Sequence, residues 1–326
     1  MTARRYLVTG GTGFLGSALV QRLVRRGHTV RVIDNNSRGN ARRLRDIDGH
    51  FEFIQADIRD AAAVSQAVAR VDSVLHLAYV NGTEFFYSKP ELVLDVGVRG
   101  MLNVIDACLA HNVGDLVLAS SSEVYQAPPM IPTPEDVPLV VPDVFNPRYS
   151  YGGGKIISEL LAVNYGRKHF QRVAIFRPHN VYGPDMGFEH VVPQFAVRLK
   201  RLADANPGTA AIPFPIQGTG EEQRAFIYVD DFIDGVMLVV EKGAHQNVYH
   251  VGNPVETRMS DVARAVAEVV GRKIEIVPGP PAPGGVTRRC PDVAKLSALG
   301  FRPTTTLRAG LEPTVRWYVD HAAEAP

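Results

Sequence analysis

A tyrosine and a lysine in residues 149–155, YSYGGGK, have a spacing that suits proton and hydride chemistry. Tyr151 precedes Lys155 by four residues, and residues four apart lie on one face of a helix. A free tyrosine has a pKa of about 10, and lowering that pKa by about 3 requires roughly 4 kcal/mol of electrostatic stabilisation. A lysine ammonium one turn away, together with a nicotinamide cation, favours the phenolate. We therefore predict that Tyr151 accepts the proton of a substrate hydroxyl while a hydride leaves the same carbon, with Lys155 as its partner.

Three glycines after an apolar run could bind the phosphates of a dinucleotide. Gly10, Gly13 and Gly16 have the spacing GxxGxxG between a strand-like run at residues 6–9 and a helical pattern at residues 17–26. Glycine permits positive φ and a close approach of the backbone to phosphate. The helix that follows would direct free N–H groups and its positive end toward the pyrophosphate. A purely structural glycine turn is the alternative interpretation.

Two carboxylates after later strand-like runs are candidates for the adenosine end of that dinucleotide. Asp34 ends the run at residues 30–34, where a carboxylate can accept hydrogen bonds from ribose hydroxyls. Its charge would repel a 2′-phosphate, so the sequence favours NAD over NADP, although Arg38 nearby could weaken this repulsion. Asp57 either binds the adenine amino group or serves as a loop or capping residue.

Strand and helix patterns alternate through the first half of the chain, which is typical of βαβ units and predicts an α/β fold with a Rossmann-type doubly wound parallel sheet. After residue 177 this alternation ends and prolines become frequent. We expect an NAD-binding domain at residues 1–177 and a smaller C-terminal substrate-binding lobe at residues 178–326, with part of the second segment crossing back to the sheet. The predicted strands are residues 6–9, 30–34, 51–57, 73–78, 116–120 and 173–177, and the predicted long helices are residues 91–112 and 149–170.

Composition and charge exclude several classes of protein. The 326 residues include 35 Lys plus Arg and 34 Asp plus Glu, and the net charge of +1 gives no basic surface for nucleic acid or an anionic membrane. The apolar runs are too short to cross a bilayer and the N-terminus has no cleavable signal pattern, so we expect a cytoplasmic protein. Cys108 and Cys290 are too few for a disulfide framework or a cysteine zinc site, and two isolated thiols are preferred over a single bridge. We predict no metal.

Eight short motifs follow one another along the chain. They are TGGTGFLG at residues 9–16, VIDNNSRG at 32–39, ADIRD at 56–60, HLA at 76–78, SSSEVY at 120–125, YGGGK at 151–155, RPHNVYGP at 177–184 and FIYVDD at 226–231. In type and order they resemble the extended short-chain dehydrogenase/reductase family, the NAD-dependent nucleotide-sugar epimerases, dehydratases and decarboxylases. The resemblance covers about residues 5–320. It implies NAD as the cofactor, a nucleoside-diphosphate sugar as the substrate, and a homodimer formed through the two long helices.

The resemblance assigns residues to each part of the cofactor. Those expected at the pyrophosphate are Gly10, Gly13, Phe14, Leu15 and Gly16. Those expected at the adenosine end are Asp34, Asn35, Ser37, Asp57 and Ile58. Those expected along the middle of the cofactor and around the nicotinamide and its ribose are Leu77, Ala78, Tyr79, Lys155, Pro178 and His179.

The resemblance also implies roles toward the substrate. It makes Tyr151 the base and Ser121 the hydroxyl that hydrogen-bonds the reacting group, because Ser121 lies four residues before the tyrosine of the VY motif. An arginine fork suits a pyrophosphate, and ordinary structural roles are the alternative for each matching position. The positions that match residues holding the substrate's phosphates or sugar are Asn180, Arg224 and Arg289.

Two positions depart from the family pattern. Gly97 stands where the long helix often carries an asparagine, so the packing behind the active site is open to question. Gln126 stands where a glycine usually follows the VY motif. The intervening loop at residues 79–90 is rich in polar and aromatic groups and is a candidate substrate-facing segment.

The family's shared first step oxidises C4 of the sugar, and three outcomes can follow. The 4-keto sugar can take the hydride back on its other face, lose water across C5–C6, or lose carbon dioxide when C6 is a carboxylate. Some dehydratases carry an Asp-Glu pair where this chain has Ser122 and Glu123, whereas other dehydratases and decarboxylases carry Ser-Glu. We rank a nucleotide-sugar 4-epimerase first, ahead of a decarboxylase of the UDP-glucuronate type and a 4,6-dehydratase that uses Glu123. A net reductase or a redox sensor is the alternative of a different class, and Tyr151, Lys155 and Ser121 together argue for catalysis.

Overall fold

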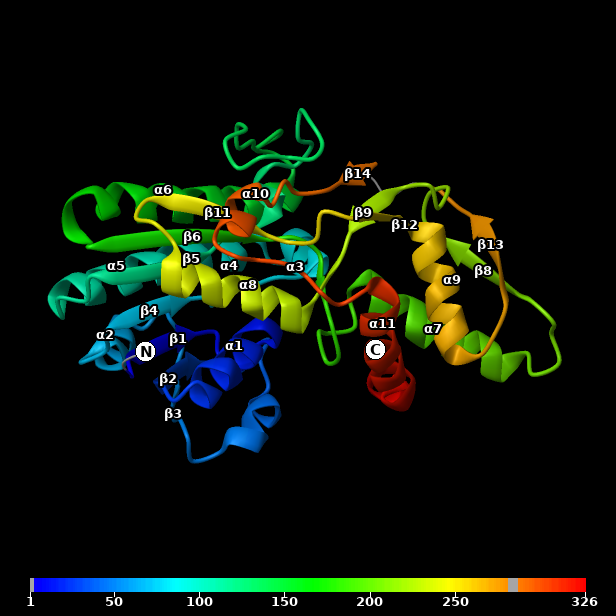
Figure 1. The fold of residues 1–326 in the computed structure, drawn as a ribbon, viewed down its shortest axis with the longest axis horizontal. Helices are drawn as coiled ribbons and strands as arrows, with labels where there is room; N and C mark the ends of the chain where they lie inside the picture. Colours follow the sequence, from blue (N-terminus) through cyan, green and yellow to red (C-terminus); the bar gives the residue numbers. More distant parts are fainter. Residues whose placement is uncertain (1–2, 281–286) are drawn as a thin grey trace.

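The computed structural model describes residues 3–280 and 287–326, and its centre is a sheet of seven strands (Figure 1). The strand order is β11-β6-β5-β4-β1-β2-β3, and every neighbouring pair is parallel. This is the predicted doubly wound parallel sheet. Its strands are β1 (Arg5–Thr9), β2 (Thr29–Asp34), β3 (Glu52–Gln55), β4 (Ser73–His76), β5 (Asp115–Ala119), β6 (Arg172–Pro178) and β11 (Asn247–Val251).

Helices cover both faces of this sheet, and each face has its own apolar core. On one face α1 packs beside α8, and on the other α5 lies between α2 and α6. Short connecting helices complete this part of the molecule. The bounds are α1 (Phe14–Arg25), α2 (Ala61–Val68), α3 (Thr83–Ser88), α4 (Pro90–Leu94), α5 (Gly100–Ala110), α6 (Ser150–His169), α8 (Val229–Lys242) and α10 (Ala294–Ala298), with 3₁₀ turns at Ala41–Ile47, Ser122–Val124 and Pro147–Tyr149.

Local sequence signals account for several helix ends. The carboxylate of Asp60 accepts the N–H groups of Ala62 and Ala63 and so caps α2. Gly27 has a φ of 79° just beyond α1, a conformation that glycine adopts without steric cost. The helical pattern predicted at residues 17–26 thus ends one residue beyond α1, and α1 begins three residues earlier than predicted.

The long helix expected at residues 91–112 is interrupted. The structure divides it into α4, a π-helical turn at Asp95–Arg99, and α5. Gly97 lies within the π turn, and a Cβ added there would overlap the ring and hydroxyl of Tyr79. The interruption thus coincides with a close approach of another segment, which a pattern of apolar spacing does not reveal.

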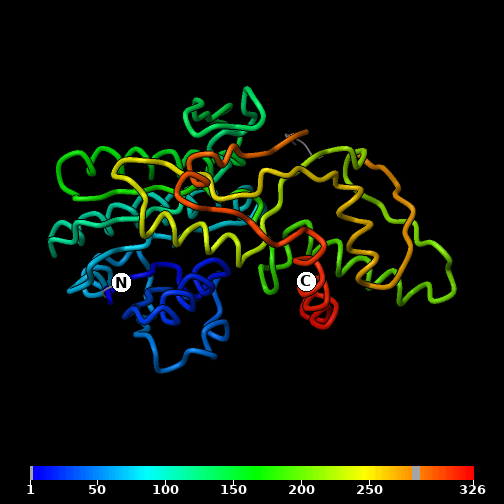
Figure 2. Tube along the Cα trace, viewed as in Figure 1, coloured from blue at the N-terminus to red at the C-terminus, as the bar shows by residue number. Residues whose placement is uncertain are grey.

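The segment that contains α8 and β11 returns to the sheet after the chain has left it. Figure 2 shows this yellow segment along the sheet before the chain continues into the lobe on the right. β11 pairs with β6 in parallel register, with Val248 opposite Ile175. Residues after 177 therefore complete the sheet as well as form the lobe.

The smaller lobe has a third apolar core. In it α7, α9 and α11 pack together, and β8 pairs with β13. Within the described ranges, no helix has the length and apolar character that a membrane span requires. The elements of this part are α7 (Val191–Ala205), α9 (Met259–Val270), α11 (Leu307–Asp320), β7 (Val181–Tyr182), β8 (Ile212–Ile216), β9 (Gln223–Ala225), β10 (Ile227–Tyr228), β12 (Glu256–Arg258), β13 (Ile274–Pro278), β14 (Arg288–Arg289) and a 3₁₀ turn at Ala322–Glu324.

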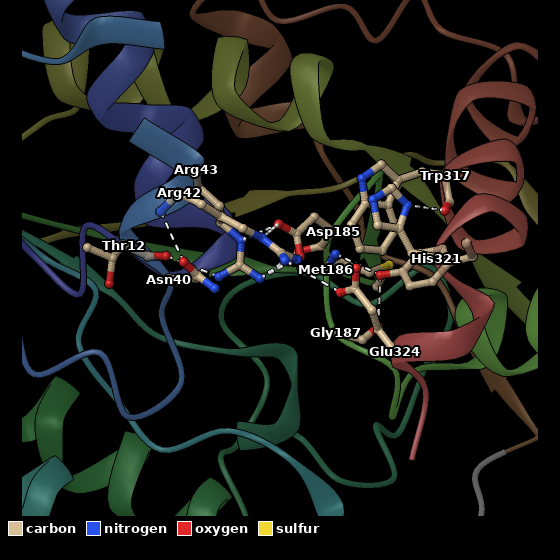
Figure 3. A network of polar contacts seen from close by, with 11 residues as sticks. Thr12, Asn40, Arg42, Arg43, Asp185, Met186, Gly187, Trp317, His321 and Glu324 are labelled. Carbon is tan, nitrogen blue, oxygen red and sulfur yellow. Dashed lines mark hydrogen bonds and ion pairs between the residues drawn. The ribbon is translucent and has the colours of Figure 1, made fainter. Parts of the chain in front are cut away.

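A polar network joins the sheet domain to the lobe beside the glycine-rich loop (Figure 3). Arg42 and Arg43 both pair with Asp185, at 3.2 and 2.9 Å. Arg43 also donates to the carbonyl oxygen of Thr12 at 3.1 Å. Arg42 reaches Glu324 near the C-terminus at 3.4 Å. These contacts hold the two parts of the molecule together at one end of the cleft described next.

Candidate active site

A cleft of about 650 Å³ crosses the carboxyl ends of the central strands. Its walls come from the loops after β1, β2, β4 and β5 and from Pro178 at the end of β6. The chain runs outward from β1 to β3 and then returns to β4 on the other side of β1, so the strand order reverses between β1 and β4. Ligands of open α/β sheets bind at such a reversal.

The glycine-rich loop forms one wall of the cleft. Gly10 has a φ of 72°, and an added Cβ would lie 2.7 Å from the backbone of Ala78. A Cβ on Gly16 would overlap the carbonyl oxygen of Gly10. The turn itself therefore requires glycine at both positions.

The N-terminus of α1 lies beyond this loop. Gly13 is its N-cap residue, and no side chain of the described residues caps the helix. Phe14 and Leu15, at the start of α1, line the cleft. The first-turn N–H groups of a helix have no partner within the helix and carry the positive end of its dipole. This arrangement fits the pyrophosphate of a dinucleotide.

Asp34 lies buried at the end of β2 with its carboxylate held in place. The N–H groups of Thr12 and Asn36 donate to its two oxygens at 3.0 and 2.8 Å. Each oxygen retains accepting capacity for ribose hydroxyls. Arg38 pairs with Glu189 at 3.2 Å, so its charge is already compensated and attracts a 2′-phosphate less. These contacts fit NAD.

Asp57 lines the same end of the cleft but has protein partners. Arg59 donates to both of its oxygens, at 3.0 and 2.8 Å, and Asn35 donates to one of them at 2.9 Å. Hydrogen bonds from Arg59 lower the pKa of Asp57 to about 2. The N–H of Ser37 in turn donates to Asn35 at 2.9 Å. The carboxylate is therefore ionised and can still accept a bond from an amino group.

Tyr151 lies at the opposite end of the cleft, in the first turn of α6. Its ring stacks on Phe86, with the centroids 4.8 Å apart and 18° between the planes. Its hydroxyl is hydrogen-bonded to the side chain of Ser121. Ser121 is itself fixed as the N-cap of the turn Ser122–Val124, where its Oγ accepts the N–H of Glu123 at 3.1 Å.

Lys155 lies one turn along α6 from Tyr151 and also lines the cleft. Its Nζ donates to the carbonyl oxygen of Ala119 at 2.7 Å. The Nζ lies 5.8 Å from the ring centroid of Tyr151. The structure therefore brings Tyr151, Lys155 and Ser121 together, from α6 and from the loop after β5.

The protein alone does not lower the pKa of Tyr151. Burial raises it to about 12, the hydrogen bond with Ser121 acts in the opposite direction, and the charge of Glu123 raises it further. Burial also lowers the pKa of Lys155 to about 7, which the charge of Glu159 only partly offsets. The lowering predicted from the Tyr-Lys spacing combined the lysine ammonium with a nicotinamide cation, so it stays a prediction for the protein with its cofactor bound.

Glu123 is ion-paired within the cleft. Arg289 from β14 bonds directly to its carboxylate, and Arg148 lies 3.9 Å from the other oxygen. Burial alone would raise the pKa of Glu123, but the charge and hydrogen bond of Arg289 outweigh it, so the pKa is lowered. Ser122, its neighbour, is buried and lines the same wall.

Two of the predicted ligand residues do not line the cleft. His179 is 1% exposed and packs edge-on against His250 at 4.6 Å, and burial lowers its pKa well below the ordinary value. Arg224 donates to the backbone of Gln223 and of Thr287, at 2.8 and 3.1 Å, and burial lowers its pKa. Neither residue is part of the cleft lining, and their roles toward the ligands stay predictions.

The other predicted residues that line the cleft are Ile58, Leu77, Ala78, Tyr79, Pro178 and Asn180. Asn180 has a φ of 42°, and its amide donates to the carbonyl oxygen of Ala225 at 2.9 Å. This bond uses one of the two N–H donors of the Asn180 amide.

Sequence reasoning missed three residues of this site. Arg148 faces Glu123, Phe86 stacks on Tyr151, and Glu189 pairs with Arg38. Arg148 directly precedes the YSYGGGK segment, and a search for cations beside that motif would have found it. Phe86 lies on α3, within the segment 79–90 expected to face the substrate, and Glu189 lies in the loop before α7; both positions depend on the fold.

The sequence predicted no metal site and two isolated cysteine thiols. Among residues 3–280 and 287–326 no group of His, Cys, Asp and Glu side chains is arranged to hold a metal ion. Cys108 and Cys290 are both buried and free.

Comparisons with known proteins relate the chain to one family. Residues 6–252 match the model of the NAD dependent epimerase/dehydratase family. The UDP-glucuronic acid decarboxylase 5 of Arabidopsis thaliana is 34% identical, with 94% of this chain and 87% of that protein covered. The dTDP-glucose 4,6-dehydratase of Streptomyces antibioticus is 31% identical, with 97% and 93% covered. The structure of the Thermus thermophilus UDP-glucose 4-epimerase in complex with NAD superposes with a TM-score of 0.83 at 28% identity, over 96% of this chain and 98% of that one.

Proposed function

The chain belongs to the NAD-dependent epimerase/dehydratase family, and on that basis we propose that it oxidises C4 of a nucleoside-diphosphate sugar and returns the hydride to the sugar within one turnover. The observation that carries this proposal is the meeting of Tyr151, Ser121 and Lys155 at one end of a cleft whose other end fits the adenosine of NAD. The cofactor is NAD, which when bound supplies a hydride acceptor and a positive charge at the nicotinamide.

Each of the three side chains has a role that follows from its surroundings. Tyr151 accepts the proton of the C4 hydroxyl and later returns it. Ser121, fixed by the N–H of Glu123, orients that hydroxyl. Lys155 supplies a cation 5.8 Å from the ring centroid of Tyr151, and the positive nicotinamide supplements it. Since burial, which the hydrogen bond with Ser121 only partly offsets, raises the pKa of Tyr151 to about 12, the base becomes effective only when these charges are present.

We propose 4-epimerisation as the first candidate for the overall reaction. Epimerisation needs no proton donor other than the tyrosine that removed the proton, because the hydride returns to the same carbon. The site supports this chemistry with Tyr151 and Ser121 alone. The fold likeness to a UDP-glucose 4-epimerase also supports it.

Dehydration is less well supported because it requires an acid for the departing hydroxyl. The pKa of Glu123 is lowered by Arg289, so its carboxyl is ionised at neutral pH. Ser122 occupies the adjacent position, and a serine hydroxyl is a far weaker acid than a carboxylic acid.

Decarboxylation of a nucleotide-linked uronic acid is the second candidate. Arg289 and Arg148 both line the cleft and act on the single carboxylate of Glu123, so positive charge exceeds negative charge at this wall of the cleft. Such a wall suits a substrate that carries a C6 carboxylate in addition to its pyrophosphate. The 34% identity to a UDP-glucuronic acid decarboxylase gives further support.

A panel of nucleotide sugars, including uronic acids, distinguishes these outcomes. The purified protein is incubated with NAD and each sugar, and the products are analysed by mass spectrometry and proton NMR. We expect a product of unchanged mass with an inverted coupling at the C4 proton. Loss of carbon dioxide would establish the second candidate. Stoichiometric consumption of NADH in a parallel incubation with the reduced cofactor would identify a net reductase and contradict the proposal.

A further inference from the structure

Tyr79 occupies a space that two glycines leave open behind the active site. An added Cβ on Gly97 would overlap its ring and hydroxyl, and an added Cβ on Gly154 would overlap its hydroxyl. Gly97 comes from the π turn between α4 and α5, and Gly154 comes from α6 next to Lys155. The large side chain of Tyr79 therefore fits only because positions 97 and 154 carry no Cβ.

The ring of Tyr79 lies against both members of the Tyr151–Lys155 pair. Lys155 Nζ is 4.0 Å from its centroid, which is within the range of a cation–π contact. The ring of Tyr151 meets it edge-on, with the centroids 5.2 Å apart and the planes at 85°. Among the described residues the buried hydroxyl of Tyr79 has no hydrogen-bond partner. The contact with Lys155 is therefore made by the aromatic face and not by the hydroxyl.

We propose that Tyr79 is a positioning residue for Lys155, whose ammonium rests on the ring that Gly97 and Gly154 admit. The Ala119 carbonyl oxygen holds the ammonium, and the ring supports it by a cation–π contact. The proposal rests on the proposed function only in that Lys155 assists Tyr151. It explains why the chain carries glycine at position 97 in place of the asparagine of the family pattern.

The charged and titratable groups around Lys155 come from three elements. The negative charge of Glu159 on α6 raises the pKa of Lys155. The positive charge of Lys155 in turn lowers the pKa of His76 at the end of β4. Burial lowers the pKa of His76 to about 3, so it is neutral at working pH. Tyr79 is also neutral, because burial and the neighbouring Tyr151 raise its pKa. Glu159 is therefore the only one of these neighbours that carries a charge, and the remaining support for the ammonium comes from neutral groups.

The first experiment measures the ammonium of Lys155 directly. Lysine labelled with ¹³C at Cε is titrated by NMR in the cofactor-free protein, and Lys155→Met identifies its signal. We expect Tyr79→Phe to leave the pKa of Lys155 unchanged, because the ring remains. Tyr79→Leu should lower it by about one, the loss expected of one desolvated cation–π contact. This readout does not depend on any substrate, so it remains valid if the proposed reaction is wrong.

The second experiment tests the fit between the ring and the glycines. Gly154→Ala should lower the melting temperature of the otherwise unchanged protein, which carries Tyr79. The same substitution in the Tyr79→Leu variant should lower the melting temperature much less. Gly153→Ala is the matched control, since an added Cβ there meets only Val141 at 3.4 Å, an ordinary contact. Gly97→Ala should behave like Gly154→Ala.

Three results would overturn the proposal. One is an unchanged pKa of Lys155 in Tyr79→Leu, which would show that the ring does not support the ammonium. Another is a decrease in the pKa of Lys155 that is as large in Tyr79→Phe as in Tyr79→Leu, which would assign the effect to the hydroxyl. The third is equal destabilisation by Gly154→Ala in both backgrounds, which would show that the glycines do not serve the ring.

Discussion

The carboxylate of Asp34 is fixed by the N–H groups of Thr12 and Asn36 and therefore cannot turn away from a bound ribose. Asp34→Ala removes two charge-assisted acceptors and the charge that repels a 2′-phosphate. We expect the affinity for NAD to fall about 10- to 100-fold, and the ratio of the affinities for NAD and NADP to decrease. Calorimetric titration with both dinucleotides measures this, with Asp106→Ala on the exposed face of α5 as the control. Unchanged affinity would contradict the role of Asp34.

Lys155 assists the function at the expense of stability, and the effect depends on pH. Burial lowers its pKa to about 7 from the ordinary value of 10.5, so the unfolded chain binds more protons between these values. Below pH ~7 Lys155 is protonated in both the folded and the unfolded state, so burying its charge lowers the free energy of unfolding by the full amount. This loss of stability declines as the pH rises toward about 10.5. Lys155→Met should therefore raise the free energy of unfolding by about 1–3 kcal/mol near pH 6, and the gain should shrink toward pH 9. Urea denaturation at a series of pH values checks this, and a gain that grows with pH would have the wrong sign.

Helix α6 and strand β6 are joined by a buried ion pair behind the site. Arg177 Nη2 lies 2.6 Å from Glu159 Oε2, and the two side chains are 4% and 7% exposed. The hydroxyl of Ser120 also donates to the carboxylate of Glu159. Glu159→Gln leaves the guanidinium without its counter-charge, which costs about 3–5 kcal/mol for a buried pair. Denaturant titration should show this loss. Glu312→Gln, which breaks the exposed pair with Arg316 on α11, is the control and should change stability little.

Elements whose signals are local were predictable from the sequence. The glycine loop and Asp34 at the end of β2 follow from neighbours in the chain, and the structure has them where expected. The π turn at Asp95–Arg99 and the ion pair of Glu123 with Arg289 depend on segments far apart in sequence. Burial, which sets the pKa values of Tyr151 and Lys155, depends in the same way on the whole fold.

At the level of the whole molecule, α4 and α6 expose apolar side chains that nothing in the described chain covers. Leu94, Ile157 and Leu160 are 38%, 39% and 56% exposed. The family resemblance implies a homodimer through these helices. We expect a mass in solution of about twice 35.6 kDa, and Leu160→Glu should reduce it to that of the monomer.

Light scattering coupled to size-exclusion chromatography measures this mass. Val255→Glu is the control, because Val255 is 65% exposed but lies in the turn between β11 and β12. A wild-type protein of 35.6 kDa in solution would contradict the dimer.

The cleft spans both parts of the molecule, so hydride transfer within a single bound complex is the claim on which the account depends. The most direct measurement uses a nucleotide sugar that is deuterated at C4, identified as a substrate in the panel, with NAD in catalytic amount. We expect a product that retains deuterium at C4, no accumulation of NADH, and no product from Tyr151→Phe although that variant still binds NAD. Loss of the deuterium to the medium or to a stoichiometric pool of NADH would contradict hydride transfer within a single bound complex.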